Sequence, residues 1–353
     1  MPSESPRQAP QEEITLPFLF SYAAEHGASD LHLVAEMRPI IRVDGELQEV
    51  ETLPTLSADD VAALITSILT DQQRRRFEQT RELDFSFKMQ HHRLRVNTHW
   101  EQGRMGLVSR IIPLHVPAMG DLGLGETEYR LIHQPQGLIL VTGPTGHGKS
   151  TTLAAMINTI NRERRVHIVT IEDPIEFQYQ EAQAIIRQRE LGTDTLSFAS
   201  ALKHALRQDP NVILVGEMRD LETISTVLTL AETGHLIFST LHTNSAAQSI
   251  DRILDVFPPH QQQQVRLQLS LVLLSVISQR LVPALRGGRI AAREILINTP
   301  AVANLIREGS TAQILSVIQT GAEYGMHTME QSLHDLADGG IVDQALAGRS
   351  RAL

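Results

Sequence analysis

The sequence predicts an α/β protein with two domains, the larger of which is built on a mainly parallel sheet. The chain has 353 residues, which is long for one domain. From residue 137 onward, apolar runs of strand length alternate with segments of helical period, the pattern of a parallel sheet that helices cover on both faces. Before residue 113, strand-like segments follow one another with few helices between them, which predicts a smaller α+β domain.

The composition narrows the class of protein. The formal net charge of −10 gives no support to a nucleic-acid partner, so none is expected. Cysteine is absent, which excludes disulfides, a cysteine nucleophile and a thiolate zinc site. The polar N-terminus does not resemble a signal peptide. The most apolar run, over residues 267–279, is too short to span a membrane and is expected to be a buried core helix. We therefore expect a soluble, cytoplasmic protein.

The first domain is expected over residues 13–113, after a polar segment over residues 1–12 that is expected to be disordered. Its elements follow from strand alternation, helical period, the N-cap residue Ser57 and the hairpin turn Asp44-Gly45. They are a helix over residues 15–27, strands over 28–50, one helix over 57–79, and two or three strands over 82–113.

An interdomain linker rich in proline and glycine is expected over residues 114–127, and the second domain over residues 128–353. A short helix opens the second domain, and strands and helices then alternate. The strands are expected over residues 138–141, 166–173, 211–217 and 235–242, and the helices over 149–160, 196–208 and 221–234. A loop is expected after residue 173, and helices are expected to dominate from residue 246 onward.

The second domain contains the sequence GLILVTGPTGHGKSTT at residues 137–152. Its glycines, Lys149 and Ser150 have the G-x-x-x-x-G-K-[ST] spacing of a P-loop, whose backbone N–H groups wrap a triphosphate at the positive end of a helix. Lys149 is expected to reach the phosphates of ATP and Ser150 to bind Mg²⁺. The residues expected to bind the nucleotide are Gly143, Thr145, Gly146, Gly148, Lys149, Ser150 and Thr151. The strand before the motif and the helix after it argue against a chance glycine turn.

Two further strands are expected to end in carboxylates, at the edge where α/β sheets place their sites. The segment TIEDPIEF contains Glu172, a candidate for polarising the attacking water, while Asp173 before a proline has the alternative role of a turn residue. The segment VILVGE ends in Glu217 and resembles a Walker B strand, although Gly216 stands where most P-loop enzymes have aspartate. Glu217 is expected to serve Mg²⁺; the alternative is a surface acid paired with Arg219.

Two histidines, His235 and His242, flank the last expected strand of this alternation. Either could sense the γ-phosphate or contact an adjacent subunit. The chain has 15 histidines, so a structural role is the alternative for each. No H-E-x-x-H or Cys/His spacing is present, so a histidine-based metal site is not expected.

Taken in order, these segments resemble the motifs of the secretion-superfamily ATPases. The Walker A motif, Asp box, Walker B motif and His box correspond to GPTGHGKSTTLAA, TIEDPIEF, DPNVILVGEMRD and AETGHLIFSTLHTNSA. Within that superfamily the chain is similar to the type IV pilus retraction ATPases, the PilT/PilU group, through ASDLHL, ELDFSF, RLRVN, DRILDVFP, AVANLIREG and GMHTMEQSL. The resemblance extends from about residue 14 to residue 345.

The resemblance implies a RecA-like P-loop ATPase domain preceded by a PAS-like domain, in a homohexameric ring that binds ATP between the two domains. It implies a motor for pilus retraction and twitching motility. Such a motor acts on an inner-membrane platform protein at the pilus base, peripheral to the inner face of the cytoplasmic membrane, with a paralogous retraction ATPase as a possible partner.

The resemblance also implies roles for individual residues. Glu172 would be the catalytic carboxylate and Glu217 the Walker B acid that binds Mg²⁺. His235 and His242 match the His-box histidines. The remaining catalytic residues that it implies are the arginines that reach the phosphates, Arg95 and Arg110.

Two departures from the family pattern bear on function. His147 stands where the family usually has serine, in a position that presents mainly backbone, so nucleotide binding is expected to survive. Ala303 stands where the retraction motif usually has arginine.

Three functions are compared: a retraction motor, an extension or secretion ATPase, and a weakly active regulatory paralogue of a retraction motor. Ala303 keeps the third open. The short first domain and the absence of cysteine argue against the second, because those enzymes typically have a further N-terminal domain and often a tetracysteine zinc module. Intact Lys149, Glu172 and Glu217 argue against the third. A DNA motor is least expected, given the acidic charge.

Overall fold

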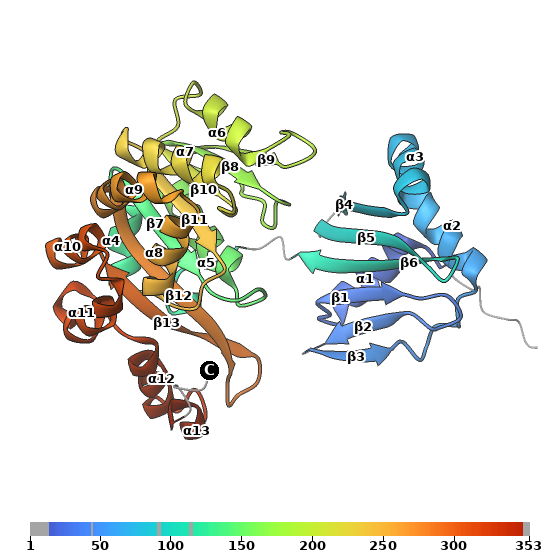
Figure 1. The fold of residues 1–353 in the computed structure, drawn as a ribbon. Coiled ribbons are helices and arrows are strands. Elements are labelled where there is room, and N and C mark those ends of the chain that lie inside the picture. Colours follow the sequence, from blue (N-terminus) through green and yellow to red (C-terminus); the bar gives the residue numbers. More distant parts are fainter. Residues whose placement is uncertain (1–13, 44, 90–92, 113–115, 349–353) are drawn as a thin grey trace, which may run out of the picture. The chain divides into compact units, whose positions relative to one another are not determined.

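The computed structural model describes residues 14–43, 45–89, 93–112 and 116–348. The chain divides into two compact units, residues 1–114 and 115–353 (Figure 1). Each unit has a hydrophobic core of its own. Within the described residues, no helix combines the length and the apolar character that a membrane span requires.

Unit 1 is an antiparallel sheet with helices packed against it. Its helices are α1 (Leu16–Glu25), α2 (Ala58–Ile68) and α3 (Asp71–Thr80). Its strands are β1 (Asp30–Leu33), β2 (Ile40–Val43), β3 (Glu46–Glu49), β4 (Glu82–Lys88), β5 (Arg93–Glu101) and β6 (Arg104–Ile112), in the sheet order β3-β2-β1-β6-β5-β4. Strands β2 and β3 pair as the hairpin prediction requires, and the turn residue Asp44 lies outside the described residues.

The single helix expected over residues 57–79 is two helices, α2 and α3, so that prediction is wrong. Each begins with a capping box, in which the N-cap side chain and the third helical residue satisfy each other's backbone N–H. The second box pairs Thr70 with Gln73, and Leu69 before it has an extended backbone and a buried side chain. The helical spacing of apolar residues continues across the N-cap residue Thr70, so the sequence pattern alone does not reveal the break.

Unit 2 is a seven-stranded sheet in the order β13-β12-β7-β11-β10-β8-β9, parallel except for the antiparallel β12–β13 pair. Its strands are β7 (Gly137–Thr142), β8 (His167–Glu172), β9 (Ile185–Glu190), β10 (Val212–Val215), β11 (Leu236–Leu241), β12 (Leu273–Pro283) and β13 (Arg289–Ile297). Its longer helices are α4 (Glu126–Ile132), α5 (Lys149–Glu163), α6 (Phe198–Ala205), α7 (Leu221–Glu232), α8 (Ala246–Asp255), α9 (Pro259–Val272), α10 (Pro300–Glu308), α11 (Ile314–Thr320) and α12 (Met329–Asp338). The short elements are η1 (Gly120–Leu122), η2 (Thr311–Gln313), η3 (Ala322–Tyr324) and α13 (Gln344–Gly348).

Strand β7 explains why the central strands read as continuous apolar runs. Leu138 and Leu140 belong to the core on one face of the sheet, whereas Ile139 and Val141 belong to the core on the other. Helices α4 and α5 supply apolar side chains to the second core, and α6 to α9 supply them to the first. A strand that is covered on both faces has no polar alternation, as the parallel-sheet prediction requires.

Three segments of unit 2 differ from the prediction. The buried helix expected between Arg266 and Arg280 is helical only as far as Val272, and its second half is β12. A short apolar run has no period that separates a buried helix from a buried strand. Strand β9 occupies residues expected to be a loop, and β13 interrupts the C-terminal region expected to be mainly helical.

The segment expected to be a linker is folded against unit 2 over its described part. Met119 and Leu124 are buried in the same core as Ile132 of α4, and the segment contains η1. Helix α4 begins at Glu126, inside the range expected to be linker.

Candidate active site

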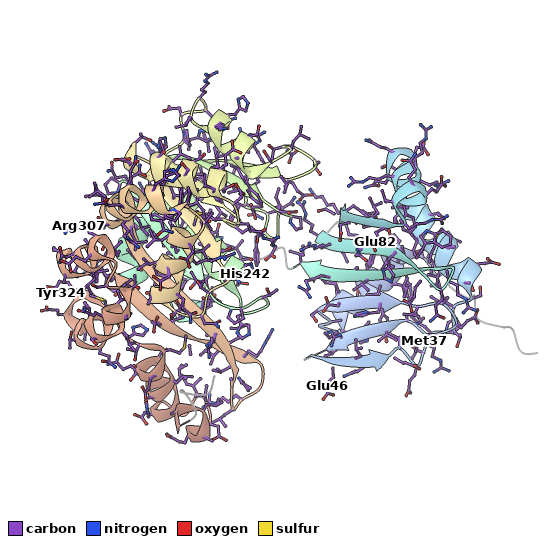
Figure 2. All side chains as sticks on the ribbon, viewed as in Figure 1. Met37, Glu46, Glu82, His242, Arg307 and Tyr324 are labelled. Carbon is purple, nitrogen blue, oxygen red and sulfur yellow. The ribbon has the colours of Figure 1, made fainter. Side chains whose placement is uncertain are left out.

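The parallel strands of unit 2 bring the predicted polar residues to one edge of the sheet. The P-loop follows β7, Glu172 is the last residue of β8, Glu217 follows β10, and His242 follows β11. Neighbouring strands are in register at these ends, since Thr142 is opposite Leu241 and Val215 is opposite Ile171. Figure 2 labels His242 where β11 ends.

The P-loop glycines have backbone conformations that suit a loop wound around an anion. Gly148 has φ of 77° and precedes the first residue of α5, so the N-terminus of that helix faces the loop. Gly143 has φ of 141°, and a Cβ atom there would overlap the carbonyl oxygen of Gln279. Glycine is required at this position by both conformation and space.

Lys149 lies at the centre of the loop. Its side chain is buried, and Nζ donates hydrogen bonds to the carbonyl oxygens of Gly143 at 2.8 Å and Pro144 at 3.0 Å. Burial lowers the pKa of Lys149, and the nearby carboxylates of Glu176 and Glu217 act in the opposite direction. These two acids favour the charged ammonium, the form that binds phosphate oxygens.

The other predicted loop residues surround Lys149. Ser150 and Thr151 lie in the first turn of α5 and are half-buried. Thr145 and Gly146 are exposed at the tip of the loop, and Gly146 has φ of 78°.

Glu172 is a buried carboxyl group, 9% exposed. Burial raises its pKa to about 7, although hydrogen bonds that Thr170 Oγ1 and Gln188 Nε2 donate to Glu172 Oε1, at 2.6 and 3.2 Å, act to lower it. A carboxyl group with a pKa near the working pH can both take and release a proton, as a general base must.

Glu217 and His242 connect the end of β10 to the P-loop. Glu217 forms an ion pair with Arg219 Nε at 2.6 Å, and His242 Nε2 lies 3.5 Å from the second carboxylate oxygen. His242 Nδ1 lies 3.3 Å from Thr145 Oγ1. Burial, followed by the charge of Lys149, lowers the pKa of His242. The pairing with Arg219 considered for Glu217 is therefore present, and it lies within the site rather than apart from it.

The donors at this edge fit Mg²⁺. The Ser150 hydroxyl and the Glu217 carboxylate are oxygen ligands, and Mg²⁺ is usually held by one or two protein oxygens together with phosphates and water. The described residues contain no group of three or more His, Cys, Asp or Glu side chains that could hold a metal ion. A site of this kind would therefore depend on the phosphates of the nucleotide.

One predicted residue, His235, does not lie at this edge, and two others, Arg95 and Arg110, belong to the other unit. His235 precedes β11 and therefore lies at the opposite edge of the sheet, about 23 Å from His242 at ~3.3 Å per strand residue. Its Nδ1 lies 2.9 Å from the carbonyl oxygen of Leu230, the structural role considered for it. Arg95 and Arg110 belong to unit 1, where they lie opposite each other on β5 and β6, and Arg110 Nε contacts Asp30 Oδ1 at 3.0 Å.

Two residues of the site were missed by the sequence interpretation. Gln188 lies on β9, which was expected to be a loop, and its contact with Glu172 depends on the pairing of β8 with β9. Gln279 lies on β12, which was expected to be helical. No local pattern marks either residue. Gln188 meets Glu172, and Gln279 meets Gly143, only because neighbouring strands bring distant segments together.

Comparisons with known proteins show the family of the chain. Residues 7–302 match the family described as "Type II/IV secretion system protein". The chain is 52% identical to the type IV pilus retraction ATPase PilT of Pseudomonas aeruginosa, over 92% of this chain and 95% of that protein. It is 50% identical to a twitching motility protein of Neisseria gonorrhoeae, over 90% and 85% of the two chains.

The fold agrees as well. A crystal structure of the pilus retraction motor PilT with bound ADP superposes with a TM-score of 0.88 at 45% identity, covering 95% of this chain and 96% of that chain. Such a match bears out the α/β fold class and the two-domain organisation expected from the sequence.

Proposed function

The chain belongs to the type II/IV secretion system protein family, and from this premise we propose that it is a hexameric, Mg²⁺-dependent ATPase that powers type IV pilus retraction. The observation that carries the ATPase activity is the meeting of Lys149, Glu172 and Glu217 at one edge of the sheet. The retraction role is supported by the similarity to PilT and to the twitching motility protein.

Four polar residues at this edge have roles in the proposed hydrolysis. Lys149 exchanges its two loop carbonyls for phosphate oxygens, and the N-terminus of α5 faces the same anion. Bound Mg²⁺ would neutralise charge on the phosphates, held by Ser150 and Glu217. Glu172 accepts the proton of the attacking water while Thr170 and Gln188 hold its carboxylate in place.

The unit 1 arginines belong to the same proposal. Arg95 and Arg110 would supply positive charge to the phosphates in the hexameric ring. Motion between the two units would act on a platform protein of the inner membrane, with the ring peripheral to the cytoplasmic face of that membrane.

A second candidate is a weakly active regulatory paralogue of a retraction motor. The observation that favours it is Ala303, which is buried on α10 and leaves that helix without the arginine usual in the retraction motif. An extension or secretion ATPase is a third candidate, since the matching family is described by its role in secretion systems.

Purified full-length protein tests these functions. We expect a hexamer by light scattering and Mg²⁺-dependent ATP turnover, with Lys149→Ala abolishing nucleotide binding. The gene should then restore retraction to a strain that lacks its retraction ATPase. Turnover without restored retraction would favour a secretion role. Negligible turnover, with retraction restored only beside a paralogous motor, would favour the regulatory role.

A further inference from the structure

Strand β12 continues beyond the end of its neighbour β7 and so runs beside the P-loop (Figure 1). The last pair between the two strands joins Thr142 to Ser278. Gln279, the next residue of β12, therefore lies beside Gly143 instead of a strand residue. The close approach of the Gln279 carbonyl oxygen to Gly143 agrees with this placement.

The side chain of Gln279 holds the loop and the helix that follows it. It is buried, and its Nε2 donates a hydrogen bond of 2.6 Å to the carbonyl oxygen of His147. Its Oε1 accepts one of 2.8 Å from Thr152 Oγ1 on α5. The peptide carbonyl of His147 can only accept, so the orientation of the amide follows from its partners.

The imidazole of His147 makes a second connection to the same strand. The backbone N–H of Leu281 donates to His147 Nδ1 at 3.0 Å, so Nδ1 must be unprotonated and the ring neutral. Burial and the charges of Arg289 on β13, Arg280 on β12 and Lys149 on α5 lower the pKa of His147, which favours the neutral ring. His147 is expected to face the nucleotide with its backbone, and its side chain anchors the loop to β12.

We propose that Gln279 and His147 are positioning residues that hold the P-loop in its phosphate-binding shape from β12 without touching the nucleotide. The proposal rests on the nucleotide site proposed above. In a trans peptide the C=O and the following N–H point in opposite directions, so holding the His147 carbonyl against β12 turns the Gly148 N–H away from that strand. Fixing the loop before binding removes part of the ordering cost that nucleotide binding would otherwise carry.

The test compares four variants of the full-length protein with the wild type: Gln279→Met, His147→Ala, His147→Asn and Thr152→Val. The equilibrium Kd for a fluorescent ADP analogue, the kcat and KM for ATP, and the Tm are measured for each. The first two variants remove the loop anchors. His147→Asn keeps a side-chain acceptor near the place of Nδ1, and Thr152→Val removes the other hydrogen bond of Gln279 while leaving its bond to the loop.

We expect His147→Ala to weaken ADP binding roughly 3- to 10-fold, the range for one net hydrogen bond, and His147→Asn to recover most of this loss. Gln279→Met should weaken binding by roughly 10-fold or more, with KM raised and kcat little changed. Thr152→Val should lower the Tm but leave the Kd within about 2-fold of the wild type.

Two results would overturn the proposal. Wild-type affinity in His147→Ala would show that the imidazole does not position the loop. Equal weakening by Thr152→Val and Gln279→Met would show that only general packing is involved. A wild type that binds no ADP is a distinguishable result, because it removes the proposed nucleotide site and the positioning role together.

Discussion

Replacing Glu172 by glutamine should abolish turnover and stabilise the fold. The glutamine has nearly the same shape and retains an oxygen that can accept the hydrogen bonds from Thr170 and Gln188. It cannot take a proton from water, so kcat should fall by roughly 10²- to 10⁴-fold, the contribution of a general base. The buried charge is lost at the same time, which is the source of the gain in stability.

The size of that gain follows from the pKa of Glu172, which burial raises from 4.5 to about 7. A raised carboxyl pKa means that the folded state holds its proton more tightly, so stability falls as pH rises from the unfolded pKa through the folded pKa. The buried charge of Glu172 lowers the free energy of unfolding by about 3 kcal/mol above pH 7, and by only about 1 kcal/mol at pH 5. Glu172→Gln removes this cost.

Urea unfolding of both proteins at pH 5 and pH 8, beside ATP turnover, tests the reasoning. The stability difference in favour of Glu172→Gln should grow by about 2 kcal/mol between the two pH values. Glu181→Gln makes the same chemical change on an exposed side chain and should alter neither turnover nor the pH dependence of stability. A pH-independent difference would refute the burial argument, and undiminished turnover would refute the assignment of the base.

Three further predictions concern single contacts. His242→Ala should lower kcat roughly 10-fold with ADP binding retained, because it removes the contact that His242 makes between Thr145 and Glu217. Steady-state ATP turnover and an ADP titration would measure the two effects. Gly143→Ala should abolish ADP binding and lower stability by more than about 1 kcal/mol, because its Cβ overlaps Gln279, as titration and urea unfolding would show. Thr70→Ala should cost about 1 kcal/mol of unit 1 stability through loss of its cap, measured by urea unfolding, with ATP turnover unchanged.

Features that are local in sequence were predicted well. The P-loop needs a strand, a glycine turn and a helix in succession, so its spacing alone placed Lys149 correctly in the structure. Glu172, Glu217 and His242 were also brought together as expected, because the carboxyl ends of parallel strands meet at one edge. The same rule applied to both ends of β11 would have separated His235 from His242 before the structure was known.

The parts that were mispredicted depend on contacts between distant segments. Thr70 ends one helix and starts another through its own side chain, a feature that the helical period conceals. Strand β9 is mixed in polarity, since Arg187 and Gln188 lie on it, and it became recognisable only through its pairing with β8. Edge strands of this kind carry too weak an apolar signal for a single sequence to reveal.

Strand β12 was predicted wrongly, and it also supplies Gln279, whose side chain contacts the P-loop. It was mistaken for a helix because nearly every side chain over residues 273–279 is buried, and a strand buried on both faces has no polar alternation. The strand continues past the end of β7, and this extension sets Gln279 against the P-loop. A surface strand would carry an exposed polar side chain there, free to move. The burial that hid β12 in the sequence therefore also holds the Gln279 side chain in place beside the loop.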